Sequence, residues 1–134
     1  MSRASSGRPT VTVVGLGPAG PEYTTPAALE AISSAPVALL RTSRHPAATV
    51  LLERANVVAL DDCYDQGGTF DEVYRSIVGR VTAAASERGR VAYAVPGSPA
   101  VAERTVELLR ADASVELDVV PGLSFCELAW ARLG

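Results

Sequence analysis

Aromatic residues and cysteines are scarce in this chain of 134 residues, and their scarcity narrows the structures it can adopt. Phe, Trp and Tyr make up only 5% of the sequence, so Val, Ala and Leu must fill most of the interior. Strands rich in such residues suit a parallel sheet that helices cover on both faces. The two cysteines, Cys63 and Cys126, lack the spacing and the additional ligands of a metal site. We therefore expect no metal, and two reduced thiols in a cytoplasmic protein.

The sequence also lacks any block of like charge and any long apolar run. Its formal net charge is −3, whereas nucleic-acid-binding domains usually carry a basic stripe that neutralises phosphates. No apolar stretch reaches the length of a membrane span. Residues 1–9 are polar and have no hydrophobic centre, so we expect a flexible leader and neither a signal peptide nor an anchor. The composition argues against nucleic-acid and membrane partners and predicts a domain over residues 10–134.

Short apolar runs alternate with longer helical patterns, which is typical of βα units and a parallel sheet. The pattern predicts strands at residues 10–14, 36–40, 56–60, 90–95 and 115–120. Helices are expected from residue 26, after Pro46 to near Arg54, over 69–88, from about 100 to 110, and after residue 122, with a polar loop at 61–68. Thr25 can cap the first helix, and Thr69 with Glu72 forms a capping box for the long one, which Gly89 ends. The sequence thus predicts an α/β three-layer sandwich around a mostly parallel five-stranded sheet.

A glycine-rich loop, Gly15-Leu16-Gly17-Pro18-Ala19-Gly20, follows the first predicted strand and matches the G-x-G-x-x-G pattern of dinucleotide sites. That fingerprint needs a helix that opens at once toward the pyrophosphate. Here prolines remove donors, the helix start at Pro26 comes late, and Arg41-Thr42 stands where an acid would hold the ribose. Dinucleotide binding is therefore the weaker alternative. The glycines can simply make a tight turn, but a close backbone approach to a ligand explains the set better.

Three segments of the sequence carry a more specific pattern. The first is the glycine loop with the strand before it and the helix entry at residues 23–25. The second is Ala94-Val95-Pro96-Gly97-Ser98-Pro99 after the fourth predicted strand, and the third is Val119-Val120-Pro121-Gly122-Leu123-Ser124-Phe125 after the fifth. Together, in this order and spacing, they resemble the amino-terminal domain of tetrapyrrole (corrin/porphyrin) methylases. The resemblance covers nearly the whole chain from Thr10 onward.

A narrower resemblance rests on residues 40–46, on 62–65 with 70–74, and on 93–106. These segments are similar to one branch of the family, in which the methylase domain is fused ahead of a MazG-type nucleoside triphosphate pyrophosphohydrolase. The chain contains no paired Glu-x-x-Glu helices of such a hydrolase. The resemblance implies that the natural polypeptide continues past Gly134, with a second methylase domain and a fused pyrophosphohydrolase as partners.

The resemblance implies S-adenosylmethionine as cofactor, held between two α/β domains, and a small-molecule methyl acceptor. By position in the family's motifs, the residues expected at the methyl donor are Pro18, Pro96, Gly97, Ser98, Val101, Ser124 and Phe125. Those expected on the acceptor side are Gly15, Gly17, Arg41 and His45. A homodimer is expected by analogy with the family, and one wall of a two-domain cleft should be poorly active alone.

The chain departs from the family pattern at two positions, where Ser98 replaces the Asp of a Gly-Asp-Pro loop and Phe125 the second Ser of a Ser-Ser pair. A non-catalytic ligand-binding or regulatory module of the pyrophosphohydrolase fusion is therefore the alternative function. Arg41 suits an acceptor carboxylate, although a solvated Arg closing a strand is the simpler interpretation. His45 is expected to be a surface loop residue rather than a catalytic base. A solvated turn explains Asp61, Asp62 and Asp65 better than a cation site, and Glu103 is expected to serve the first turn of its helix.

Overall fold

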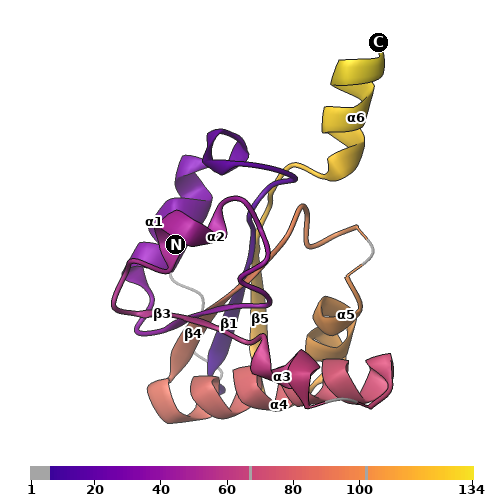
Figure 1. Ribbon diagram of the computed structural model, residues 1–134. Helices are drawn as coiled ribbons and strands as arrows, with labels where there is room; N and C mark the ends of the chain where they lie inside the picture. The colour runs from indigo at the N-terminus through magenta and orange to yellow at the C-terminus, as the bar shows by residue number, and fades with distance from the viewer. Residues whose placement is uncertain (1–6, 67, 102) are drawn as a thin grey trace.

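A computed structural model describes residues 7–66, 68–101 and 103–134, and it contains a five-stranded sheet in the order β3-β2-β4-β1-β5 (Figure 1). The strands are β1 (Thr10–Gly15), β2 (Ala38–Leu40), β3 (Val57–Ala59), β4 (Arg90–Val95) and β5 (Glu116–Val120). Every pairing between these strands is parallel. All five carboxyl ends therefore lie at one edge of the sheet, where ligands of open α/β sheets bind.

Alternating side chains of the strands build two separate cores, one on each face of the sheet. In β4, Val91, Tyr93 and Val95 face one core, whereas Ala92 and Ala94 face the other. The sheet face that carries Val91, Tyr93 and Val95 packs under α4 (Phe70–Arg88) and α5 (Arg104–Ala111). The opposite face, which carries Ala92 and Ala94, packs under α1 (Pro26–Ser34) and α2 (Ala48–Leu51). The predicted three-layer sandwich is confirmed (Figure 1).

The helix signals in the sequence are found where they were expected. Thr25 accepts a hydrogen bond from Ala28 N at the start of α1, and a capping box joins Thr69 and Glu72 at the start of α4. Gly89 ends α4 with a φ of 82°, in the left-handed region where glycine is favoured. A second capping box, between Ser124 and Glu127, begins α6 (Phe125–Leu133).

Two local predictions were wrong. The polar loop contains a short helix, α3 (Asp62–Asp65), because the carbonyl oxygens of Asp61 and Asp62 accept hydrogen bonds from backbone N–H groups three and four residues later. Residue 67 of this loop lies outside the described residues. The helix expected from about residue 100 begins at Arg104, since a turn closed from Val101 N to Ser98 O comes first; residue 102 is not described.

The described residues before β1 are attached to the domain. Arg8 donates a hydrogen bond to Ala113 O at 3.2 Å and pairs with Glu116 at 3.6 Å, while residues 1–6 of the expected leader lie outside the described residues. Cys63 and Cys126 are both free thiols. In the described part of the chain, no helix is long and apolar enough to cross a membrane.

Candidate functional site

Loops from three neighbouring strands meet at the carboxyl edge of the sheet, at Gly15, Gly97 and Gly122. A Cβ atom on Gly15 would lie 2.7 Å from both Gly122 N and Gly97 O. A Cβ on Gly122 would likewise lie 2.7 Å from the carbonyl carbon of Gly15. At Gly15, the absence of a side chain therefore lets the backbone of two other loops approach, rather than a ligand. It brings together the three segments that carry the sequence pattern.

The glycine loop itself is fixed by hydrogen bonds to its backbone. Gly17 N donates to Gly97 O at 3.1 Å, and Gly97 N donates to Gly17 O at 2.8 Å. Thr24 Oγ1 donates to Leu16 O at 2.8 Å. Gly17 has a φ of 83°, so the loop does turn tightly. Pro18 follows that turn, and the first long helix begins only at Pro26, as the sequence predicted.

His45 is buried, so the expectation of a surface loop residue was wrong. Only 8% of its surface is exposed. Its Nδ1 accepts a hydrogen bond from Ala47 N at 3.1 Å, which leaves Nε2 to donate to Gly17 O at 2.9 Å. The ring is thus the neutral tautomer that carries its proton on Nε2. Nε2 thus holds the glycine loop, whereas Nδ1 holds the turn that leads into α2.

Arg41 is half-buried rather than fully solvated, and its guanidinium forms an ion pair with Glu103 at 2.5 Å. The other carboxylate oxygen of Glu103 accepts from Thr105 Oγ1 at 2.8 Å, and Thr105 Oγ1 in turn lies 2.8 Å from Tyr93 Oη. Burial acts to lower the pKa of Arg41, but the charge and hydrogen bond of Glu103, together with the nearby Tyr64 and Tyr93, raise that pKa on balance. We call Arg41, Glu103, Thr105 and Tyr93 the buried polar chain.

The role expected for Glu103 in the first turn of its helix was wrong. Glu103 makes no side-chain cap on α5, and only 6% of its surface is exposed. Sequence reasoning missed the buried polar chain, although one signal was available. A tyrosine in the middle of an apolar strand needs a partner for its hydroxyl, and Tyr93 is fully buried. Burial raises the pKa of its phenol.

The loop after β4 offers mainly backbone groups. Gly97 has a φ of 66°, and the direction in which a Cβ would point is open, with Leu123 O as the nearest atom at 3.9 Å. Ser98 Oγ accepts from Ala100 N at 3.2 Å. Across the edge, Ser124 caps α6 through its hydroxyl, whereas 63% of Phe125 is exposed.

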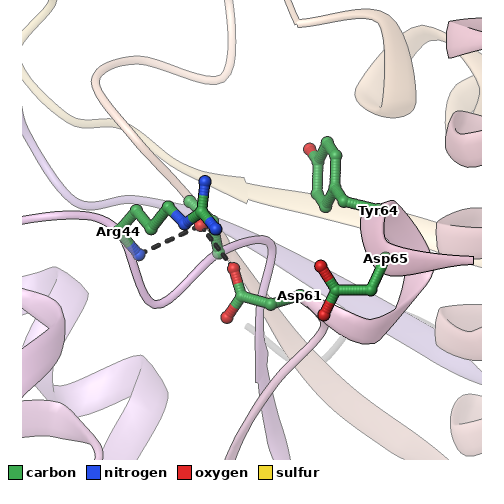
Figure 2. A pocket seen from close by; sticks show the side chains of 5 residues that line it. Arg44, Asp61, Tyr64 and Asp65 are labelled. Carbon is green, nitrogen blue, oxygen red and sulfur yellow. Dashed lines mark hydrogen bonds between the residues drawn. The ribbon is translucent and has the colours of Figure 1, made fainter. Parts of the chain in front are cut away.

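A pocket of about 430 Å³ lies beside the ends of β2 and β3 and is lined by Thr42, Arg44, Asp61, Tyr64 and Asp65 (Figure 2). Burial acts to raise the pKa of Asp61, but hydrogen bonds from Ser43 and Thr42 outweigh it and lower that pKa. Thr42 Oγ1 donates at 2.7 Å and Ser43 N at 2.8 Å.

The third carboxylate of the acidic run, Asp62, pairs with Arg80 at 2.6 Å on the surface. Among the described residues, no group of three or more His, Cys, Asp or Glu side chains can hold a metal ion. Asp62 and Asp65 are exposed and Asp61 is half-buried, as the expected solvated turn requires, while the hydrogen bonds to Asp61 and the ion pair of Asp62 hold the turn in place.

The helix α6 extends away from the body of the domain (Figure 1). None of its residues is buried, and 71% of Trp130 and 85% of Leu133 are exposed. Phe125, which begins the helix next to the strand-end loops, is exposed as well, so the large apolar side chains of α6 are uncovered.

Comparison with known proteins gives one family match and one similar curated protein. A family model described as tetrapyrrole (corrin/porphyrin) methylases matches residues 10–134. The uncharacterized protein YabN of Bacillus subtilis (strain 168) is 36% identical over 121 residues, which are 87% of this chain and 24% of YabN.

Solved structures show the same fold. Uroporphyrin-III C-methyltransferase from Thermus thermophilus is 29% identical, with a TM-score of 0.66 over 87% of this chain and 49% of the enzyme. Precorrin-6Y methylase from Archaeoglobus fulgidus is 26% identical, with a TM-score of 0.70 over 92% of this chain and 58% of that one. A structure of the Thermus enzyme with S-adenyl homocysteine is 24% identical, with a TM-score of 0.63 over 90% of this chain and 51% of that one. The chain spans about half the length of these structures.

Proposed function

Because this chain belongs to the tetrapyrrole (corrin/porphyrin) methylase family, we propose that it forms the amino-terminal wall of an S-adenosylmethionine-dependent methyltransferase site. The observation that carries the proposal is the meeting of three strand-end loops at Gly15, Gly97 and Gly122. These loops hold the three segments of the family pattern. They lie at the carboxyl edge of a parallel sheet, where α/β proteins bind their ligands.

The methyl donor would lie over the loop after β4. Gly97 supports this placement, since its open side lets a ligand approach the backbone without meeting a Cβ. The exposed ring of Phe125 suits an adenine face. We propose that the donor contacts Pro18, Pro96, Gly97, Ser98, Val101, Ser124 and Phe125. The structure of the Thermus enzyme with S-adenyl homocysteine supports this class of ligand.

The chemistry asks little of the protein beyond alignment. The sulfonium of S-adenosylmethionine supplies an electrophilic methyl group, so the protein mainly orients the donor and the acceptor and excludes water. Backbone amides and carbonyls of the fixed loops around Gly17 and Gly97 can do this, because their mutual hydrogen bonds hold them in place.

We propose a small-molecule acceptor on the side of Gly15, Gly17, Arg41 and His45, next to the pocket of about 430 Å³. The pocket is in the size range of small-molecule sites. Arg41 Nη1 is paired with Glu103, and both ring nitrogens of His45 are hydrogen-bonded within the chain, so we propose that the two residues shape this side of the edge and do not bind the acceptor directly.

We propose that a second domain forms the other wall. The matched structures are about twice as long as their matched part, and the apolar surface of α6 lies uncovered beside the loops. Apolar surface of this kind usually marks an interface. A cytoplasmic location, in keeping with two free thiols, and a homodimer remain proposals by analogy with the family.

The second candidate function is a non-catalytic ligand-binding or regulatory module in a MazG-type pyrophosphohydrolase fusion. Ser98 favours it, because a hydroxyl replaces the carboxylate of the family loop. Glu103 does not compensate, since Arg41 and Thr105 occupy both its oxygens. YabN also favours it, because the matched segment is only 24% of that protein and leaves room for further domains.

Calorimetric titration tests the proposed donor site, and an assay of methyl transfer separates the two functions. S-adenosylmethionine, S-adenosylhomocysteine and NADPH are titrated into this chain and into the full-length product of its gene. Micromolar binding of the two sulfur ligands, and not of NADPH, by the full-length product is the expected result. Methyl transfer by that product then separates an enzyme from a regulatory module. Absence of binding to either form contradicts the methyltransferase proposal.

A further inference from the structure

We propose that Arg41 and Glu103 are positioning residues, which hold the loop after β4 in the conformation that receives the ligand. This inference rests on the proposed function, because it concerns the same loop. The described residues of this loop are 96–101 and Glu103, which directly precedes α5, and the part around Gly97 and Ser98 is the proposed donor contact. The juxtaposition that carries the inference is an ion pair between the half-buried Arg41, at the end of β2, and the buried Glu103, at the far end of this loop.

The near end of the loop is fixed through the glycine loop. Leu16 N donates to Val95 O at 2.9 Å, and Gly97 N donates to Gly17 O at 2.8 Å. The far end is fixed through Glu103. Arg41 is itself anchored, because its backbone N donates to Ala94 O at 3.0 Å before its side chain reaches Glu103.

Glu103 has no freedom to leave Arg41. One of its oxygens meets Arg41, and the other accepts from Thr105, whose hydroxyl is in turn bonded to Tyr93. Thr105 and Tyr93 are fully buried. A carboxylate this deeply buried is tolerated only when it is paired and hydrogen-bonded, so any movement of Glu103 breaks several contacts together.

The arrangement serves placement more than stability. Glu103 occupies the cap position of α5 without capping it, and Arg41 Nε is buried without a hydrogen-bond partner. A helix start that served stability alone would use a cap, and a buried ion pair is weak support for a fold. The ion pair instead holds the far end of the loop, at Glu103, in a single position.

The loop has few other restraints of its own. Between Gly97 and Glu103, the described hydrogen bonds are those from Val101 N to Ser98 O and from Ala100 N to Ser98 Oγ, both 3.2 Å. Val101 is exposed. When the ion pair is removed, the far end of the loop is free to move, while the sheet beneath it keeps its pairing.

Amide hydrogen exchange in Glu103→Gln and Arg41→Met tests the inference. We expect the amide of Val101 to exchange at least about tenfold faster in both variants, as loss of a hydrogen bond to a charged group implies. The amide of Gly89, at the end of α4, should keep its rate. Arg41→Lys keeps the charge and should restore part of the protection. Arg80→Met, which breaks the exposed pair with Asp62, is the matched control and should leave Val101 unchanged.

Titration of S-adenosylhomocysteine into the full-length product, and into the same variants of that product, tests the proposed function independently of hydrogen exchange. We expect a drop in affinity that parallels the faster exchange of Val101. An unchanged Val101 amide in Glu103→Gln, or equal acceleration at Val101 and Gly89, overturns the positioning role. A wild-type product that binds no S-adenosylhomocysteine overturns the proposed function instead, whatever the amide of Val101 does.

Discussion

Replacing Gly15 by alanine should destabilise the domain and separate the strand-end loops. The new methyl group would lie 2.7 Å from Gly122 N, 2.7 Å from Gly97 O and 2.8 Å from Gly122 Cα. Real Cβ atoms do not approach other heavy atoms so closely, and all three neighbours are backbone atoms that cannot rotate away. The strain must therefore be relieved by moving one of the three loops.

The magnitude follows from what overpacking does in a close-packed interior. Extra methyl groups there typically cost about 1–3 kcal/mol, and the rigid neighbours place the cost of Gly15→Ala at about 3 kcal/mol. Gly79→Ala is the matched control, with the same chemical change in the middle of α4. A Cβ on Gly79 meets nothing within 4 Å, so this variant should be more stable by about 0.5–1 kcal/mol.

Urea unfolding followed by circular dichroism measures both variants against the parent chain. We expect the midpoint to fall for Gly15→Ala and to rise for Gly79→Ala, with unchanged slopes. A Gly15→Ala chain as stable as the parent would refute the close meeting of the loops. Equal destabilisation by both substitutions would mean that the effect is unrelated to that meeting.

Three further substitutions test the polar contacts at the carboxyl edge. Tyr93→Phe removes a buried hydrogen bond and should cost about 1 kcal/mol in urea unfolding at neutral pH. Because burial raises the pKa of Tyr93 in the folded chain, the parent should lose stability above pH about 10. The difference in unfolding free energy between the parent and the variant should therefore shrink there. A difference that stays constant with pH would contradict the burial of Tyr93. Asp61→Asn tests a lowered pKa, whose stabilising effect is present above the unfolded value of about 3.9 and is lost as the pH falls through the folded value. Its urea midpoint should therefore approach that of the parent in acid, and a gap that widens there would contradict the contacts of Asp61. His45→Ala removes the hydrogen bond from the ring to Gly17 O and the one that the ring accepts from Ala47 N, and it should cost about 2 kcal/mol in thermal unfolding; a loss near zero would place His45 outside the core.

Much of the fold could be predicted because its signals are local. The alternation of apolar runs and helices indicated the parallel sheet, and the capping box at Thr69 fixed the start of α4. The short helix α3 was missed because a single turn has no periodicity to detect. The late start of α5 was missed because the turn closed at Ser98 depends on a hydrogen bond that the residue pattern does not indicate.

The site was harder to predict because its contacts join residues that are distant in sequence. Arg41 and Glu103 are 62 positions apart, and His45 lies 28 positions from Gly17. Nothing near His45 in the sequence indicates that the glycine loop will cover it. The residue types were informative, since a lone histidine and a strand-end arginine were singled out. Their partners could be assigned only after the sheet order placed β2 beside β4.

The most direct test of the account is to observe where S-adenosylhomocysteine contacts the chain. Amide chemical shifts of the full-length product are recorded during a titration with this ligand. We predict that the largest changes fall on Gly97, Ser98, Val101, Ser124 and Phe125, with the amides of α4 unaffected. Changes confined to other parts of the chain, or no changes at saturating ligand, would contradict the proposed donor site.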